Sequence, residues 1–501
     1  MAGPASTIVT ELEAQTDLAK ALIARAQARG AFLIWRAQAT RAARLLVRSG
    51  RVEEAVVAQG SGHGVHAVLD DGRSAFGSRD DFGPEPSAAL LDATIDAASS
   101  GGALGVAGGS FAPDAPSTAR DLPAGIAAFD ALDLDAASAR LVALERELTS
   151  DLPGVTTTLA FQAVLEVWRI LRSDGADVLF AVPRCVLRAS LSSSGDARHT
   201  VGASLADPSP RMFDDPAAVA TFLARARAAG SLAAALPDAP THPAGSFPLV
   251  IDYALAKGLA HEAFGHASEA DGFRSSVLAR DGRFRSGDTV GPAHVSVIDE
   301  PVQGDFAWQP YSATGSPRRR ATIVDHGRLR DALTDAWSAR GAGTALTGAD
   351  RAESFRSAPL PRMSNIRIEL DDPLPAPGAF EDYSAERVRD LLGDAGIFSR
   401  HRRVAFLSGY GGGQVNPPTG DFVFNCKAIY ALGPDEVVLH KPAIFSGSMF
   451  GALGAVREGF GPLKLDAIGS CGKWGQSVPS SGGSHYFLVL DPDPGVRLGG
   501  R

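Results

Sequence analysis

One segment of the chain carries residue types that can bind a metal ion and activate a water molecule. Residues 254–273 read ALAKGLAHEAFGHASEADGF, which places Glu262 directly after His261 and His266 five residues after His261. Neutral imidazoles are common zinc ligands, and a neighbouring carboxylate can take a proton from an attacking water molecule. The pattern therefore predicts metal-assisted hydrolysis with Glu262 as the general base.

The spacing of the two histidines does not suit a regular α-helix. Five residues at 3.6 per turn correspond to a rotation of about 500°, which leaves the two imidazoles ~140° apart around the helix. For both rings to face one ion, the helix must widen into a π-bulge or bend at Gly265. On spacing alone, two ordinary helix histidines that bind no metal are an equally good interpretation.

Segments in both halves of the chain resemble the TldD/PmbA family of metallopeptidases, also described as TldD/TldE or modulator-of-gyrase-like proteins. In the first half the resemblance rests on residues 48–79 (RSGRVEEAVVAQGSGHGVHAVLDDGRSAFGSR) and 171–178 (LRSDGADV). In the second half it rests on HEAFGHASEADG at 261–272, LPRMSNIRIEL at 360–370, GYGGGQVNPPTGDFVFNCKAIYAL at 409–432 and GSCGKWGQSVPSSGG at 469–483. These matches follow the family's order from about residue 30 to residue 485.

The resemblance implies a complete metal site. In the family, two motif histidines and a cysteine near the C-terminus hold a zinc ion, and these correspond to His261, His266 and Cys471. Three protein ligands leave one position open, which is typical of a catalytic site. Because zinc deprotonates a coordinating thiol, Cys471 would be a ligand and not a nucleophile. The other two cysteines, Cys185 and Cys426, lack this context and are expected in the core.

Other residues near these motifs are candidates for handling the substrate. Tyr410, Gly412 within the Gly411–Gly413 stretch, and His485 could bind the substrate or stabilise an oxyanion, although each has a plausible structural role. Either Glu269 or Asp271 could orient a ligand imidazole, since metal-binding histidines usually donate their second ring nitrogen to an acceptor.

The resemblance also implies a substrate and partners. The chain keeps the metal motif, so it resembles the catalytic TldD type and not the metal-free partner type. This implies a metallopeptidase that hydrolyses unfolded or short peptides bound as extended strands. It further implies a homodimer or a heterodimer with a metal-free TldE/PmbA-type paralogue.

One segment departs from the family pattern and keeps two other functions open. Catalytic members usually have an acidic Asp-Glu-Gly where this chain has Ser312-Ala313-Thr314-Gly315 after Tyr311. If the acidic pair helps to hold the substrate, the chain could be a specialised biosynthetic amidohydrolase that acts on a peptide-like metabolite. A third interpretation is a non-catalytic peptide-binding or scaffolding subunit.

The elements that must position these residues predict an α+β protein of two domains. Short β-prone runs separated by Gly-containing turns predict an N-terminal β-meander with flanking helices over residues 1–240. The region from 241 to 501 is predicted to be a mostly antiparallel, barrel-like domain that carries the metal helix. A length of 501 residues is consistent with two domains.

Composition excludes several other classes of protein. Hydrophobic residues make up 45% and charged residues 21%, as in ordinary globular proteins, and the net charge of -9 argues against a nucleic-acid partner. No secretory signal or membrane span is expected from the sequence. Three widely spaced cysteines argue against a disulfide framework, so a reducing cytoplasm is expected.

Overall fold

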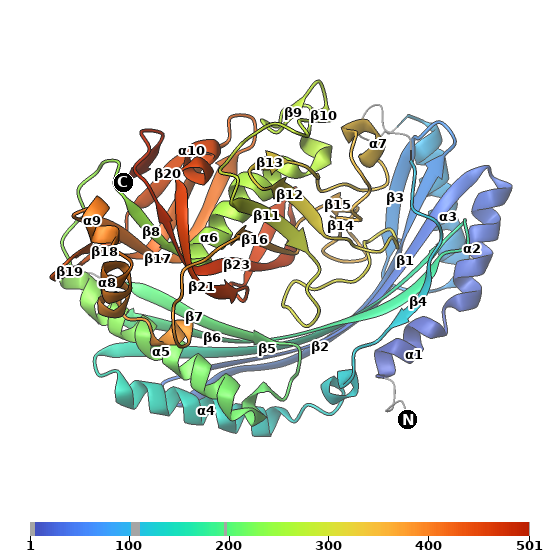
Figure 1. Cartoon of the computed structure of the whole chain (residues 1–501). Coiled ribbons are helices and arrows are strands. Elements are labelled where there is room, and N and C mark those ends of the chain that lie inside the picture. The colour runs from blue at the N-terminus through green and yellow to red at the C-terminus, as the bar shows by residue number, and fades with distance from the viewer. Residues whose placement is uncertain (1–5, 102–110, 195–197, 500–501) are drawn as a thin grey trace.

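Two large β-sheets divide the chain between them (Figure 1). The computed structural model describes residues 6–101, 111–194 and 198–499. The first sheet uses strands between residues 31 and 207, and the second uses strands between residues 249 and 498. The α+β class predicted from the sequence is confirmed.

The first sheet is a set of long antiparallel strands with one short parallel strand at its edge. The strand order is β3-β2-β1-β5-β6-β4. Strand β6 pairs with β4 and also with β7. Strands β5, β6 and β7 follow one another along the chain and pair antiparallel, as expected of a meander. The bounds are β1 (Ala31–Arg48), β2 (Arg51–Leu69), β3 (Ser74–Arg79), β4 (Thr118–Asp121), β5 (Val155–Arg172), β6 (Asp177–Ser193) and β7 (Thr200–Asp207).

The segment RAARLLV at 41–47 would form a helix on local propensity, yet it lies in the middle of β1. It pairs with β2 on one side and with β5 on the other, so ladders on both edges override the local preference. The hairpin turn at Ser49-Gly50 has positive φ values of 52° and 68°, as a tight two-residue turn requires.

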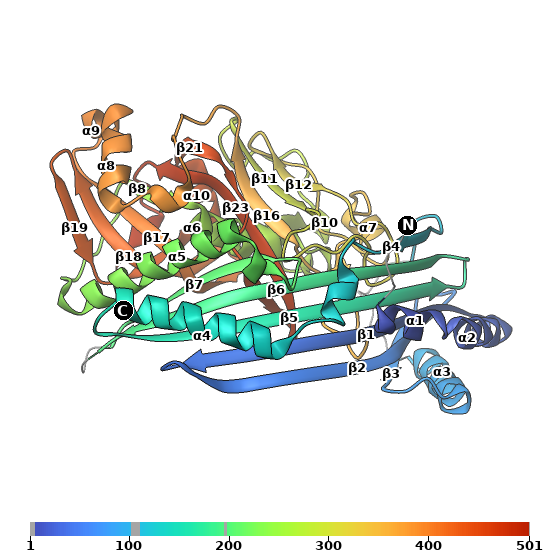
Figure 2. The same cartoon turned by 90° about the horizontal axis from the view of Figure 1, so that it is seen from below.

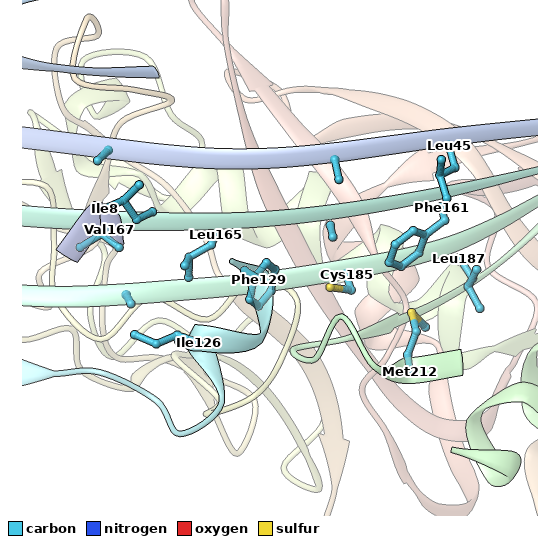
Figure 3. Close-up of a cluster of buried hydrophobic side chains, with 14 of the residues drawn as sticks. Ile8, Leu45, Ile126, Phe129, Phe161, Leu165, Val167, Cys185, Leu187 and Met212 are labelled. Atoms are coloured by element: carbon cyan, nitrogen blue, oxygen red, sulfur yellow. The ribbon is translucent and has the colours of Figure 1, made fainter. Parts of the chain in front are cut away.

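Five helices cover one face of the first sheet (Figure 2). They are α1 (Thr7–Glu13), α2 (Thr16–Ala28), α3 (Pro84–Ser99), α4 (Leu134–Asp151) and α5 (Pro216–Ala235). Figure 3 shows part of the core beneath them, where Phe161 and Leu165 of β5 point toward Phe129 and Met212. Cys185 lies in this core, in agreement with its expected structural role.

Helix α5 belongs to a longer helical stretch, Pro216–Asp238, that meets a length and composition test for a membrane span. Its mean hydropathy is 1.2 over the most apolar window, of which 39% is buried. Phe222, Ala226 and Ala233 are fully buried in the core of the first sheet, and Arg225 forms ion pairs with Glu381 and Asp466. These contacts account for the apolar composition, because a helix packed on a sheet needs an apolar stripe.

The second sheet has thirteen strands in the order β13-β12-β11-β16-β23-β8-β17-β18-β20-β24, with β19 on β18 and with β21 and β22 on β23. The strand bounds are β8 (Leu249–Asp252), β11 (Val295–Glu300), β12 (Ala321–Asp325), β13 (Arg328–Leu329), β16 (Asn365–Leu370), β17 (Val404–Asn416), β18 (Asp421–Gly433), β19 (Glu436–His440), β20 (Ile444–Ser448), β21 (Val456–Lys464), β22 (Gly469–Lys473), β23 (Gln476–Leu490) and β24 (Val496–Leu498). Strand β8 lies centrally, between β23 and β17, and it leads into the helix that carries the histidines.

Short strands and helices complete the second half of the chain. Two small hairpins are formed by β9 (Ala279–Arg280) with β10 (Arg283–Phe284) and by β14 (Asp350–Arg351) with β15 (Leu360–Pro361). The helices are α6 (Tyr253–Leu259), α7 (Ala339–Ala342), α8 (Ala385–Asp394), α9 (Ile397–Arg400) and α10 (Met449–Gly454).

The second half is mostly antiparallel, as predicted, but over the residues that the structure describes its sheet does not close into a barrel. Within the described residues the sheet is open, and it runs from β13 to β24 without returning to its start. A barrel closes only when its end strands pair with each other. Here the end strands β13 and β24 do not pair with each other within the described residues.

The two sheets share a buried contact. The domain limits of 1–240 and 241–501 stay a prediction. Trp168 and Phe180 of the first sheet lie in one apolar cluster with Trp308 and Trp337 of the second half. In strand β1, alternate residues face this contact and the helix-covered core, as for Ile34 and Trp35.

Candidate metal centre

The metal helix changes its geometry where the two histidines lie. Helix α6 ends at Leu259, a π-helical turn covers Ala260–Gly265, and a 3₁₀ turn covers His266–Ser268. The π-helical widening expected from the five-residue spacing is therefore present. It brings the rings of His261 and His266 to a centroid distance of 5.1 Å, with their planes nearly perpendicular.

Packing against a neighbouring segment explains the glycine before the second histidine. A Cβ atom on Gly265 would overlap Sδ of Met363 and crowd Ile366. Both neighbours are fully buried; Met363 lies just before β16 and Ile366 lies within it. Gly265 therefore lets the π-helical turn lie directly against the sheet.

Cys471 completes a set of three potential ligands. One ligand atom from each of His261, His266 and Cys471 lies within 4.8 Å of the others, and Sγ of Cys471 is 3.5 Å from Nε2 of His266. Ligand atoms around a tetrahedral zinc ion are separated by roughly 3.5 Å. In addition, Nδ1 of His261 is buried with no hydrogen-bond partner among the described residues. This donor set and its spacing fit a zinc ion with an open fourth position.

The carboxylate of Glu262 lies beside this set and is held by a tyrosine. The hydroxyl of Tyr410 donates a hydrogen bond of 3.1 Å to Oε1 of Glu262, and Oε2 is 3.9 Å from Nε2 of His266. Burial raises the pKa of Glu262, against the effect of His266 and Tyr410. The tyrosine ring lies directly against Gly258, where an added Cβ would be 2.6 Å from a ring carbon.

A second buried acid orients His266. Its Nδ1 donates to Oε2 of Glu269 at 3.1 Å, and the Nζ of Lys473 donates to Oε2 of Glu269 and to Oδ1 of Asp271 at 2.8 and 2.7 Å. Burial opposes ionisation of Glu269, but Lys473 and His266 outweigh it and lower the pKa to about 2. Glu269 therefore holds one ring nitrogen of His266 while the other faces Cys471.

A cavity of about 720 Å³ opens onto these residues. Its lining includes His261, Glu262, His266 and Cys471, and Gly413 and Gln414 lie on its wall. Gly412 sits next to this wall, in a bulge of β17 with φ of 100°, but it does not line the cavity.

His485 is not brought to the site. Its Nδ1 donates to the carbonyl of Gly461 at 2.7 Å, and its Nε2 accepts from the backbone N–H of Leu370 at 3.1 Å. With both ring nitrogens bonded to the backbone, the side chain ties β23 to its neighbours and has no free atom for a substrate.

Comparisons with known proteins agree with this geometry. Residues 244–459 match the model of the PmbA/TldA metallopeptidase C-terminal domain, and residues 36–100 match the model of PmbA/TldA metallopeptidase domain 1. The chain belongs to the TldD/PmbA family. The matched regions contain the metal helix and most of the first hairpin.

Curated relatives in the TldD/PmbA family are named as metalloproteases. The chain is 35% identical to a metalloprotease of Methanocaldococcus jannaschii over 48% of this chain and 49% of the relative. It is 28% identical to a zinc metalloprotease TldD homolog of Saccharolobus solfataricus over 50% of this chain and 51% of the relative. The chain thus spans about half the length of the curated relatives it matches.

Solved structures of the family share the fold over nearly the whole chain. TldE from Thermococcus kodakarensis has a TM-score of 0.74 at 14% identity and covers 96% of this chain and 100% of its own. A putative modulator of DNA gyrase from Thermotoga maritima has a TM-score of 0.71 at 16% identity, with 96% and 99% covered. At these identities the likeness concerns the fold alone.

The segment that departs from the TldD/PmbA pattern lies at the contact between the two sheets. Ser312–Gly315 is buried and does not line the cavity at the metal site. Oγ of Ser312 accepts from the N–H groups of Thr314 and Ser316, both at 3.2 Å. A Cβ on Gly315 would crowd Ile170 of the first sheet. The departure therefore affects the contact between the two sheets.

Two residues near the site lie within the motif segments but were not identified as candidates from the sequence. Trp474 lines the cavity at 76% exposure, on a turn where its φ is 49°. Lys257 lies one helical turn before His261 and is buried. Its position four residues before the first ligand was the available signal, because residues at that spacing share a helix face.

Proposed function

We propose that this chain is a zinc-dependent metallopeptidase that hydrolyses amide bonds of unfolded or short peptides. The observation that carries the proposal is the convergence of His261, His266 and Cys471 beside Glu262 on one cavity wall. The names of the curated relatives, one of them a zinc metalloprotease, support it.

The proposed ligands suit zinc better than a harder ion. Two imidazoles and a thiolate form a borderline-soft donor set, whereas magnesium and calcium prefer oxygen ligands. When bound, zinc would supply Lewis acidity that activates water and polarises a carbonyl group.

The chain's own residues would perform the proton transfers. Glu262 accepts a proton from the attacking water and returns it to the leaving amine. Its burial raises its pKa, which favours the return of the proton. Tyr410 fixes one oxygen of Glu262, while Glu269 and Lys473 fix the ring of His266. These contacts hold the base and one ligand in place before a substrate arrives.

The proposed substrate class follows from the form of the cavity. It is open to solvent beside the Gly413-Gln414 backbone, which suits an extended peptide bound through main-chain groups. A specialised amidohydrolase is less well supported, because Ser312–Gly315 lies at the sheet contact and does not line the cavity.

Assembly and location are part of the proposal. A TldE-type fold among the structural neighbours supports a homodimer or a heterodimer with a metal-free paralogue. Light scattering of the purified chain, alone and with such a paralogue, distinguishes the two. The three cysteines are free, which supports a reducing cytoplasm.

The decisive experiment combines metal analysis with peptide hydrolysis. Wild-type protein should contain one zinc ion per chain and cleave an unfolded casein-type substrate. Glu262→Gln should retain the zinc and lose at least about 10²-fold in kcat. Peptide cleavage at the wild-type rate in that variant would refute the general-base role. Zinc-loaded wild-type protein that cleaves no peptide would support the scaffolding alternative.

A further inference from the structure

A buried ammonium group lies behind the metal site without an acidic partner. Lys257 is only 4% exposed, and its Nζ donates one hydrogen bond, of 3.1 Å, to Oγ of Ser480. Within the described part of the chain, no carboxylate lies within ion-pair distance of it. A neutral donor could satisfy the serine equally well, so this hydrogen bond does not explain a lysine.

The charges that act on Lys257 belong to the metal site. Burial lowers its pKa to about 8, while Cys471, Glu262 and Asp305 act in the opposite direction. Asp305 already accepts hydrogen bonds from Ser481 and from the N–H of Ala307. Two of the three negative groups whose charges act on Lys257 are therefore the proposed thiolate ligand and the proposed general base.

The charges at the proposed zinc site indicate which negative charge the Lys257 ammonium group would stabilise. The thiolate of Cys471 and the carboxylate of Glu262 together cancel the two positive charges of a zinc ion. Amide hydrolysis then places a further negative charge on the attacked carbonyl oxygen. Lys257 is buried, so water screens its charge only weakly, and it acts on that step together with the buried Arg351 and Arg362, whose charges also reach Cys471.

We infer that Lys257 speeds amide hydrolysis by its charge, as a positioning residue that stabilises the negative charge developing on the substrate oxygen. This inference rests on the proposed function and adds a residue to it. Lys257 acts from one turn earlier on the metal helix and does not touch the substrate, because it lines a separate cavity of about 550 Å³ and not the cavity at the candidate metal site.

The energetics of burial separate this role from a structural one. An uncompensated buried charge destabilises a fold, and an apolar side chain of similar size is often neutral or stabilising in its place. Lys257→Met should therefore fold at least as stably as wild type. A lysine needed for structure predicts the opposite, a fall in Tm.

Lys427 provides a matched control. It is a second lysine of the same 550 Å³ cavity, but its Nζ donates to the carbonyl of Gly202 at 2.7 Å and the carboxylate that acts on it is Asp252. Lys427→Met removes an equal charge from the same cavity without removing one that faces Cys471 or Glu262.

The test measures kcat, KM, zinc content, Tm and the affinity for a phosphonamidate peptide, an anionic mimic of the tetrahedral state. In Lys257→Met we expect kcat to fall at least about 10-fold and phosphonamidate affinity to fall by a similar factor. KM, zinc content and Tm should not fall, and Lys427→Met should keep the wild-type kcat. Addition of ethylamine to Lys257→Ala should restore part of the lost kcat. This second variant tests the role of the charge even if Lys257→Met folds poorly.

Three results would overturn the inference: an unchanged kcat in Lys257→Met, a loss of zinc that accounts for the lost activity, or an equal loss in Lys427→Met. Active wild-type protein with an equally active Lys257→Met rejects the role of Lys257 alone. Zinc-loaded wild-type protein that neither cleaves peptides nor binds the phosphonamidate rejects the proposed function, and this inference with it.

Discussion

The hydroxyl of Tyr410 donates a hydrogen bond of 3.1 Å to Oε1 of Glu262 and so joins strand β17 to the π-helical turn. The two residues are 148 positions apart in the chain. The contact is possible because Gly258 leaves room for the tyrosine ring on the metal helix. The position of the proposed general base therefore depends on a residue of the opposite strand.

Removing this hydroxyl should slow catalysis without unfolding the protein. Tyr410→Phe keeps the ring against Gly258 and frees Glu262 to rotate, so kcat should fall about 10-fold with zinc content unchanged. Steady-state kinetics on an unfolded peptide measure the effect. Tyr383→Phe, which loses an exposed hydroxyl bonded to the carbonyl of Pro377, is the control. Equal kinetics in wild type and Tyr410→Phe would contradict the positioning role.

Cys471→Ala should lose zinc while the chain stays folded. Cys471 is almost fully buried, but its side chain is small, and the loss of a thiolate ligand weakens binding at neutral pH. Equilibrium dialysis against a zinc chelator measures the affinity, and circular dichroism checks the fold. Cys426→Ala removes a buried thiol of the same core and should keep its zinc. Full zinc stoichiometry in Cys471→Ala would exclude it as the third ligand.

Glu269→Gln should weaken metal binding by about 10- to 100-fold, because the neutral amide no longer makes the His266 ring a stronger ligand. Lys473 would keep its hydrogen bond to Asp271, so the β22–β23 turn should hold its place. Competition with a fluorescent zinc indicator gives the affinity. Glu353→Gln, at an exposed site outside the cavity lining, is a suitable control. An affinity unchanged by Glu269→Gln would show that the hydrogen bond to His266 is dispensable.

Gly265→Ala should destabilise the fold by about 2 kcal/mol or more, because its methyl group overlaps Met363 in a closed core. Urea unfolding of the two variants and the double variant Gly265→Ala/Met363→Ala tests this. Met363→Ala alone should also destabilise the fold. The double variant should lose less unfolding free energy than the sum of the two single losses. Strict additivity would mean that the clash is relieved elsewhere.

Stability should fall on the acid side of neutrality because of a buried histidine between the sheets. His66 is 8% exposed, stacks on Trp337 at 4.7 Å, and has no hydrogen bond to either ring nitrogen among the described residues. Burial lowers its pKa to about 3, with a smaller contribution from Arg36. The folded state therefore binds this proton only at a lower pH than the unfolded chain, in which the histidine pKa is about 6.5.

The stability due to neutral His66 is complete above pH 6.5 and is lost as the pH falls toward 3. Between pH 6.5 and pH 4.5, protonation linked to His66 should lower the free energy of unfolding by about 2 kcal/mol. Urea unfolding at both pH values measures the loss, and His66→Phe should reduce it by that amount. The same pH dependence in wild type and variant would place the acid sensitivity elsewhere, for example at His63, whose pKa burial lowers to about 4.

The local features of the site could be predicted because local geometry governs them. The five-residue spacing of His261 and His266 requires a widened helix, since the rotation per residue is fixed by the backbone. Residue chemistry predicts Glu262 as the base, and this role stays a prediction. Cys471 required the family resemblance, because its partner His266 lies 205 residues earlier and no spacing rule connects them.

Other features were decided by long-range packing. The segment RAARLLV became part of β1 because β2 and β5 pair with both of its edges. The second sheet is open because its end strands β13 and β24 do not meet within the described residues, which depends on how segments far apart in the chain pack. His485 could not serve the site once backbone groups bonded both of its nitrogens.

The sequence by itself determined the donor types, the distorted helix, the α+β class and membership in the TldD/PmbA family. Tertiary structure alone decided that Tyr410 contacts Glu262, that Lys257 is buried behind the metal site, and that Ser312–Gly315 lies at the contact between the sheets. The physical reason is distance along the chain. Helix geometry and residue chemistry act between near neighbours, whereas burial, charge compensation and strand pairing depend on segments that meet only after folding.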